Sequence, residues 1–191
     1  MVELDINQQL SLLSLARKTI ADKLSIENSI ISDDFKEKIY AEKCGAFVTL
    51  HKKGELRGCI GYIEGYKSIP DTIREMAVSA AFKDPRFSPL KADEYNSIDL
   101  EISVLSPIEK VNDISEIVVG RDGLIITRGY NRGLLLPQVA TEYGWDRETF
   151  LEQTCRKAGL PANAWKDSST IIEKFSAQVF GENTLSDNGT S

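Results

Sequence analysis

Cysteine and histidine are scarce in this sequence, and their scarcity excludes several kinds of site. The three cysteines, Cys44, Cys59 and Cys155, are an odd number and widely spaced, so they form no disulfide framework. Together with the single histidine, His51, they match no closely spaced ligand pattern of a structural zinc site. We therefore predict reduced thiols and no bound metal.

Long apolar runs and an excess of positive charge are also missing. No apolar stretch in the 191 residues could span a bilayer, and no charged-then-apolar leader opens the sequence. The net charge of -6 and the pI near 5.0 argue against a broad electrostatic grip on nucleic acid or an anionic membrane. The glycine spacing matches neither a Rossmann nor a Walker phosphate site. We expect a cytoplasmic protein that binds neither nucleic acid nor membrane.

The composition that remains, 41% hydrophobic and 27% charged residues, is that of a globular protein, and its periodicity predicts both helices and strands. In the first helix we expect one stripe to form the packing face. That stripe consists of Leu10, Leu13, Arg17, Ile20 and Leu24. The helices are predicted at about 7–24, 68–82 and 146–158. Besides a hairpin, strands are predicted at about 98–105, 124–127, 133–136 and 171–180, before a disordered tail from 182 to 191.

The stretch Cys44–Tyr62 predicts a β-hairpin. A three-residue loop that ends at Gly54 separates apolar from polar residues most cleanly. In that register Cys59 lies opposite Phe47. The polar face then carries Phe47, Thr49, His51, Glu55, Arg57, Cys59 and Gly61, and the apolar face carries Val48, Leu50, Leu56, Ile60 and Tyr62.

Cys59 is the leading functional candidate. On the polar face its thiol is accessible, and the flanking Gly58 and Gly61 let a ligand or another backbone approach closely. Arg57, on the same face, would lower the thiol pKa. The alternative, which the sequence leaves equally open, is a small half-buried cysteine beside glycines that serve a bulge.

A thiol–imidazole dyad of His51 and Cys59 is not expected. In the three-residue-loop register His51 lies opposite Glu55, and strand geometry separates it from Cys59 by roughly 13 Å. His51 is therefore interpreted as a surface residue near the turn.

Glu101 is the expected partner of the hairpin's polar face. Together with Ser103 it projects from the polar side of strand 98–105. If that strand pairs beside the hairpin, both residues share a surface with Arg57 and Cys59. The alternative is a solvated strand face with an Arg–Glu pair.

Arg86 adds a further candidate binding group. It lies in Asp84-Pro-Arg-Phe87, which predicts an ordered turn that ends a helix. Loops that border a sheet often carry binding groups. The alternative is that Arg86 bonds only to carbonyls of its own loop.

These segments together resemble the AMMECR family, also called AmmeMemoRadiSam system protein A. The run Leu56-Arg-Gly-Cys-Ile-Gly61 is the signature of that family, and the other matches follow in family order over nearly the whole chain. The matching segments are Gly45–Leu50, Gly54–Gly61, Ala80–Phe87, Glu101–Pro107, Gly133–Val139 and Trp145–Pro161.

The resemblance implies an α+β fold, with a mainly antiparallel sheet flanked by helices, a second smaller α/β lobe and a cleft between the lobes. It places a single domain at 1–181, its larger lobe at about 1–107 plus 170–181 and its smaller lobe at about 108–169. A Memo-type protein and a radical S-adenosylmethionine protein are its implied partners. It implies no particular activity, and no cofactor is assigned.

Two functional hypotheses remain open. In the first, the protein is an enzyme or enzyme component, with Cys59 as working thiol, Arg57 as thiolate or anion stabiliser and Glu101 as orienting or proton-transfer group. In the second, it is a binding or adaptor module that recognises a protein or small ligand through the same face. The candidate binding residues are Gly58, Gly61, Arg86, Ser103 and Gln138.

Overall fold

The computed structural model describes residues 3–27 and 35–186, and the chain divides into two compact units. Unit 1 comprises Met1–Leu105 and Gln178–Ser191, and unit 2 comprises Ser106–Ala177. Strand β7 (Ile171–Gly181) passes from unit 2 into unit 1, and the predicted lobe bounds stay a prediction. The cleft between lobes stays a prediction.

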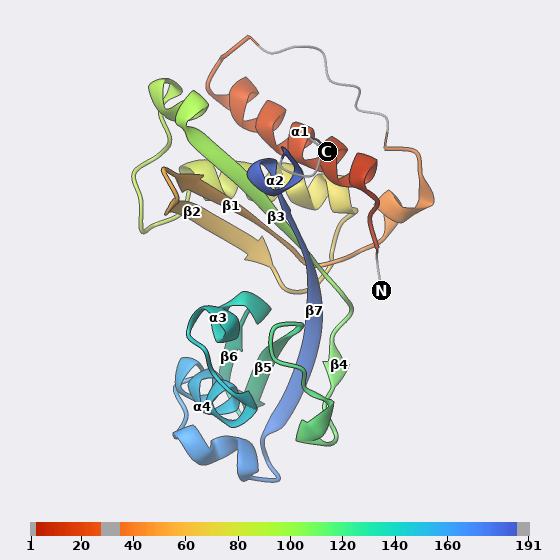
Figure 1. Cartoon of the computed structure of the whole chain (residues 1–191), viewed down its shortest axis with the longest axis vertical. Helices are drawn as coiled ribbons and strands as arrows, with labels where there is room; N and C mark the ends of the chain where they lie inside the picture. Colours follow the sequence, from red (N-terminus) through yellow and green to blue (C-terminus); the bar gives the residue numbers. More distant parts are fainter. Residues whose placement is uncertain (1–2, 28–34, 187–191) are drawn as a thin grey trace. The chain divides into compact units, whose positions relative to one another are not determined.

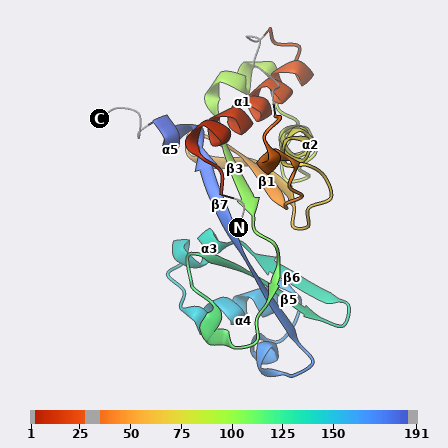
Figure 2. The ribbon, with the colours of Figure 1, turned by 90° about the vertical axis from the view of Figure 1, so that its right-hand side faces the viewer.

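Unit 1 is a small antiparallel sheet beside two helices. β1 pairs with both β2 and β3, which gives the strand order β2-β1-β3. α1 and α2 lie next to these strands (Figures 1 and 2) and enclose the apolar core. The elements are α1 (Ile6–Lys23), β1 (Ala46–Lys52), β2 (Glu55–Tyr62), α2 (Ile69–Phe82), β3 (Ile98–Leu105) and α5 (Glu182–Ser186), with 3-10 helices at Lys38–Ala41 and Ala92–Ser97.

The helix caps explain where the helices begin. Ser68 caps α2, as predicted, and Pro70 occupies its first turn. Asp5 caps α1 by accepting a hydrogen bond of 2.9 Å from the Gln8 N–H. The predicted packing stripe of α1 is wrong in part, because the helix packs against both α2 and β3 and its buried face is rotated. Leu10 is 46% exposed, whereas Leu12 and Ala16 are fully buried.

The predicted hairpin register is wrong, and the reason is a β-bulge. Lys53 and Gly54 have φ angles of 55° and 82°, so they form a two-residue turn with both central residues in the left-handed region. The ladder then shifts beyond the Leu50–Gly58 pair, which leaves Arg57 as the extra residue of the bulge. Cys59 consequently lies opposite Thr49 and not opposite Phe47.

With the bulge in place, most apolar and polar side chains of the hairpin still lie on the faces predicted for them. Val48 and Leu50 point into the core and are fully buried. Leu56 is the exception: it pairs with His51 and is 42% exposed, although the sequence placed it on the apolar face. Because the register is different, His51 is only two residues along β1 from the partner of Cys59, which is closer than predicted.

Unit 2 has its own core, and the antiparallel pairings of both units confirm the predicted α+β class. β5 pairs with β6 and β7, and β4 pairs with β7 (Figure 1). Its elements are β4 (Glu109–Lys110), β5 (Asp122–Arg128), β6 (Asn131–Leu135), α3 (Pro137–Glu142), α4 (Arg147–Lys157) and β7, with 3-10 helices at Ile114–Glu116 and Ala162–Lys166.

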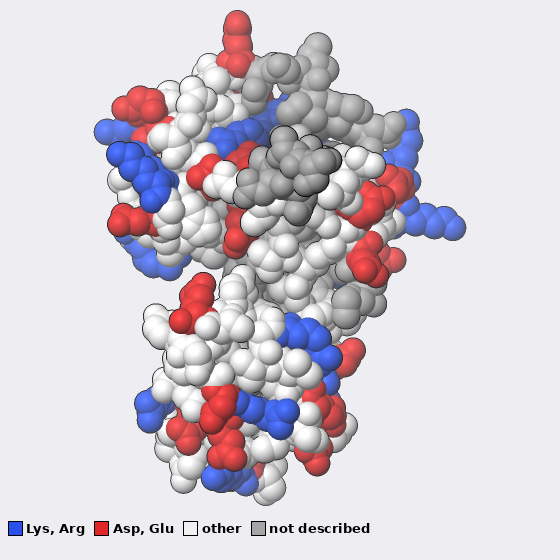
Figure 3. All heavy atoms as spheres, in the orientation of Figure 1, with Lys and Arg blue, Asp and Glu red and all other residues white. Residues whose placement is uncertain are grey.

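Two further expectations concern the tail and the surface. The predicted disordered tail is wrong at 182–186, where α5 forms, and 187–191 lie outside the described residues. Basic and acidic side chains are interspersed on the face that Figure 3 shows. Among the described helices, none has the length and apolarity needed to cross a membrane.

Candidate functional site

Three polar side chains lie in one row across the sheet of unit 1. Thr49 pairs with Cys59 of β2 on one side and with Glu101 of β3 on the other. The Thr49 hydroxyl donates a hydrogen bond of 3.1 Å to the Cys59 Sγ. The face that they share, opposite the core face, is called the outer face; its residues are Phe47, Thr49, His51, Cys59, Gly61, Asp99, Glu101 and Ser103.

β3 therefore pairs with β1 and not with β2, and it contributes residues to the outer face from the other side of β1. The structure brings Glu101 and Cys59 onto one surface but keeps Thr49 between them. Across two strand spacings their Cα atoms are roughly 10 Å apart. Thr49 is the residue that lies between the two candidates, and nothing in its sequence context predicts this position.

Two side chains of one loop hold the backbone N–H and C=O groups of Cys59. Its N–H donates to the Asp84 Oδ2 at 2.9 Å, and its carbonyl accepts from the Arg86 Nη2 at 3.2 Å. Arg86 also donates from Nε and Nη2 to the two Asp84 oxygens, at 3.0 and 2.7 Å. The Asp84 side chain is 1% exposed. We call this arrangement the edge clamp, because it takes the place of a neighbouring strand on β2.

The local sequence makes the edge clamp possible. α2 ends at Phe82, and Pro85 favours a turn directly after Asp84. Within this turn the Arg86 N–H donates to the Asp84 Oδ1 at 3.1 Å, and the Phe87 N–H donates to the Asp84 carbonyl at 3.1 Å. The Arg86 guanidinium makes the largest contribution to holding the pKa of the Asp84 carboxyl well below its usual range, and the backbone N–H groups of Cys59 and Arg86 add to it.

Arg57 points to a different partner from the one predicted. Its Nε and Nη2 donate to the Glu94 carboxylate at 3.2 and 3.0 Å, and Lys52 donates to the same carboxylate at 2.8 Å. Arg57 first and Lys52 second lower the pKa of Glu94 to about 2. The cation that acts on the Cys59 thiol is Arg86.

The Cys59 thiol is protonated at neutral pH. Burial raises its pKa above the ordinary value, and the charges of Asp84 and Glu101 act in the same direction. The hydrogen bond from Thr49 and the charge of Arg86 oppose this shift without reversing it. The thiol is therefore poorly prepared to act as a nucleophile.

The two glycines beside Cys59 accommodate parts of the protein itself. A Cβ on Gly58 would lie 2.2 Å from the Ala80 carbonyl oxygen of α2. A Cβ on Gly61 would lie 2.3 Å from the Phe47 ring. Close approach is thus the reason for both glycines, as the sequence suggested, but a helix backbone and a side chain make that approach.

A family model describes nearly the whole chain. The AMMECR1 model matches residues 13–180, which include every candidate site residue named above. The chain belongs to the AMMECR1 family.

Relatives in the family are found among archaea. A protein of Methanothermobacter thermautotrophicus is 47% identical over 178 residues, which cover 90% of this chain and 93% of that protein. A protein of Methanocaldococcus jannaschii is 45% identical over 187 residues, with coverages of 90% and 92%. The crystal structure of an uncharacterised Pyrococcus horikoshii protein matches with a TM-score of 0.80 and 40% identity, covering 90% of this chain and 89% of its own.

The remaining candidates of this AMMECR1 chain lie elsewhere. Ser103 is on the outer face but only 2% exposed, so the predicted exposure of that position is wrong. Its neighbour across the ladder is Phe47. Gln138 lies on α3 in unit 2, and its buried Oε1 has no hydrogen-bond partner among the described residues.

Asp84 is the residue that sequence reasoning missed. It was treated only as part of a turn, although aspartate before proline is a common turn former and a carboxylate acceptor. That chemistry indicates a capping role, but nothing in the sequence tells which backbone N–H it receives. The same holds for Glu94, which precedes β3 and binds Arg57 of the preceding hairpin.

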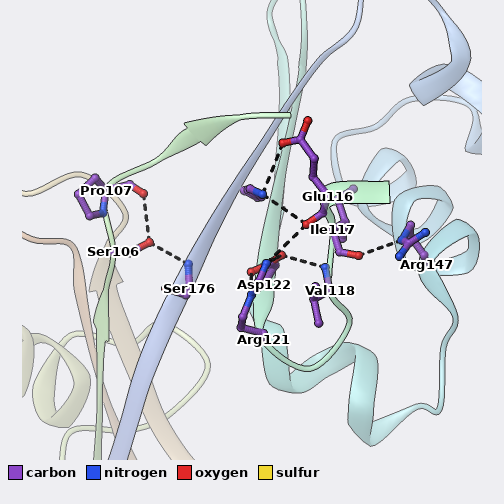
Figure 4. A network of polar contacts seen from close by, with 10 residues as sticks. Ser106, Pro107, Glu116, Ile117, Val118, Arg121, Asp122, Arg147 and Ser176 are labelled. Atoms are coloured by element: carbon purple, nitrogen blue, oxygen red, sulfur yellow. Dashed lines mark hydrogen bonds and ion pairs between the residues drawn. The ribbon is translucent and has the colours of Figure 1, made fainter. Parts of the chain in front are cut away.

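Unit 2 contains an aspartate, Asp122, with contacts similar to those of Asp84 in the edge clamp (Figure 4). The Asp122 oxygens accept from Arg121 Nε and Nη2, both at 2.7 Å, and from the Val118 N–H at 2.9 Å. Arg147 donates to the Ile117 carbonyl at 2.9 Å and ties the same loop to α4. A buried aspartate that pairs with a largely exposed arginine is therefore also used here simply to hold a loop, and the edge clamp differs in holding a candidate site residue.

The described residues offer no second candidate for a functional site. None of their His, Cys, Asp and Glu side chains forms a group of three or more that could hold a metal ion. A surface hollow of about 530 Å³ beside α2, lined by residues such as Phe35, Tyr40 and Pro70, contains none of the candidate residues.

Proposed function

We propose that this AMMECR1 protein is a binding module that recognises its partner through the outer face of unit 1. The recognition surface is centred on Cys59, Thr49 and Glu101, with Arg86 at the β2 edge. Its partners on this proposal are a Memo-type protein and a radical S-adenosylmethionine protein, which the family resemblance implies. Cys59 takes part as a neutral, closely packed thiol.

The observation that carries the proposal is the edge clamp. Because Asp84 and Arg86 fix the Cys59 peptide, the surface is preformed, and binding requires little further ordering of this strand. Burial keeps the thiol protonated. Both features favour recognition over nucleophilic chemistry.

A change in the middle of the row is expected to weaken partner binding. Thr49→Arg places a long cation between Cys59 and Glu101, and we expect the dissociation constant for a Memo-type protein to rise roughly tenfold or more. Cys59→Ser should stay within about threefold, because it keeps the size and hydrogen bonding of the side chain. Isothermal titration calorimetry measures both.

Thr141→Arg, at an exposed position of α3 in unit 2, is the control for an added arginine. Thr49→Val, which removes only the hydroxyl, guards against a misfolded Thr49→Arg protein. Unchanged affinity in a folded Thr49→Arg variant contradicts the proposal.

An enzyme or enzyme component is the second candidate, and the Thr49–Cys59 hydrogen bond in this row supports it. Cys59 would be the working thiol, and Glu101 would move a proton by way of the Thr49 hydroxyl. Arg86 would stabilise a thiolate or anion, a task first assigned to Arg57. This function requires that the thiol ionises readily once a ligand is bound.

The pH dependence of alkylation separates the two candidates. Cys44 and Cys155 are 5% and 0% exposed, so iodoacetamide modifies Cys59 first in the folded protein. We expect its rate to keep rising beyond pH 9.0, because the thiol pKa is raised above that value. Cys59→Ser supplies the background rate. A plateau near neutral pH, alone or with a Memo-type protein present, would instead support the enzyme.

A further inference from the structure

The free edge of β2 carries hydrogen-bonding groups in two different states. β2 is the outermost strand of the sheet, and successive residues of β2 turn their N–H and C=O groups alternately toward β1 and away from it. The Cys59 N–H and C=O point away, where the edge clamp binds them. Gly61, two residues on in the same unbroken register, turns its N–H and C=O to the same edge.

Gly61 presents these groups without a side chain of its own. A Cβ on Gly61 would lie 2.3 Å from the Phe47 ring, so that ring occupies the place of a side chain on the outer face. A strand added along this edge could therefore bond to Gly61. It would have to end at Cys59, because the clamp already occupies the next pair of groups.

Arg86 stands at the point where such a strand would end. Its Nε and Nη2 are engaged, whereas Nη1 has no hydrogen-bond partner among the residues that the structure describes. Its side chain is 54% exposed, and the Phe87 ring centre lies 5.5 Å from its guanidinium carbon. An arginine held in this way is preorganised to donate to an oxyanion.

We propose that the edge of β2 at Gly61, together with the Arg86 side chain beside Cys59, binds the C-terminal segment of a partner polypeptide. The terminal carboxylate of that segment accepts a hydrogen bond from Arg86. β2 runs from Cys59 toward Gly61, so an antiparallel strand that passes Gly61 ends beside Cys59. Backbone pairing supplies the strand addition, and Arg86 recognises the end of the chain. The inference rests on the proposed binding function and specifies the ligand of that binding module.

Asp84 determines how the carboxylate is recognised. Its charge offsets that of Arg86 across a 2.7 Å ion pair. Recognition therefore depends on the directed N–H donors of Nη1 more than on net charge, and the affinity should change little with salt. Inorganic anions, which form no backbone bonds with Gly61, should bind poorly.

The test compares two fluorescein-labelled pools of random hexapeptides, one with free C-terminal carboxylates and one with C-terminal amides. We expect the immobilised protein to retain roughly fivefold more of the free-acid pool, the effect of one charge-assisted hydrogen bond. In ¹⁵N-labelled protein the Gly61 amide resonance should shift with the free-acid pool. Equal retention of the two pools, or a Gly61 resonance that does not move, overturns the proposal.

Variants assign the preference to Arg86. Arg86→Gln should abolish the preference for free acid, and Arg86→Lys should reduce it, because lysine lacks the fork that anchors to Asp84. Arg74→Gln, which alters another arginine paired with an aspartate, should leave it unchanged. A preference that survives in folded Arg86→Gln contradicts the assignment.

The comparison of acid and amide pools needs no variant, so a poorly folded Arg86→Gln protein leaves the test intact. If a Memo-type protein binds the wild type but not Thr49→Arg, and the two peptide pools are retained equally, this inference fails and the binding function stands. If the free-acid pool is preferred and no Memo-type protein binds, the partner assignment fails alone.

Discussion

Gly58→Ala is expected to destabilise unit 1 by about 3 kcal/mol or more. The added Cβ would lie 2.2 Å from the Ala80 carbonyl oxygen and 3.2 Å from its carbonyl carbon. Both are backbone atoms of α2, so no side chain can rotate away and either β2 or the helix must move. The core that the helix covers includes Val48 and Leu50, which are fully buried. Urea unfolding followed by circular dichroism measures the loss.

Gly54→Asn in the same hairpin is the matched control. Gly54 has a φ of 82° and nothing within 4 Å of a Cβ, and asparagine tolerates the left-handed region better than other residues. We expect a change below about 1 kcal/mol. If Gly58→Ala were as stable as Gly54→Asn, the close packing of α2 on β2 would be wrong.

The expected loss also bears on function. Gly58 is a candidate for ligand binding on sequence grounds, because a glycine admits close approach. Since a helix backbone makes that approach, a defect of Gly58→Ala in partner binding would report on the fold of unit 1. Thr49 and Arg86 are the better positions at which to test binding, because their side chains lie on the outer face and at its edge.

The sequence predicted best those elements whose signals are local. The sequence alternates between apolar and polar residues from Ile98 to Val104, and the structure has strand β3 at Ile98–Leu105. α2 begins after a serine cap with proline in its first turn, and it also ends as predicted. Such patterns depend on neighbours in the chain, so one sequence contains them in full.

The candidate site was predicted less completely, because it depends on contacts distant in sequence. The bulge at Arg57 changes the partner of Cys59, and only the packed sheet determines where a bulge falls. The edge clamp joins Asp84 to Cys59 across 25 positions of sequence. Residue types alone placed Cys59, Glu101 and Arg86 among the candidates. They could not show that Arg86, and not Arg57, is the cation beside the thiol.

Asp84→Ala is expected to cost about 2–4 kcal/mol, the second large effect. It removes a side chain that is 1% exposed, leaves the Cys59 N–H without its acceptor and releases Arg86 from its anchor. Because Arg86 is 54% exposed, it regains water, and this keeps the loss below that of a fully buried pair. Arg86→Gln should cost less, since Asp84 then retains the N–H donors of Cys59 and residue 86.

Asp84→Asn isolates the charge from the shape, and pH gives the decisive measurement. The folded pKa of Asp84 lies below its ordinary value of 3.8, so ionisation stabilises the fold above that pH. This contribution is lost as the pH falls below 3.8. The stability advantage of the wild type over Asp84→Asn should therefore be full at pH 7 and shrink on acidification through pH 3. An advantage that is independent of pH would mean that the edge clamp holds Cys59 by shape alone, and that Arg86 is not anchored by charge at the edge of β2.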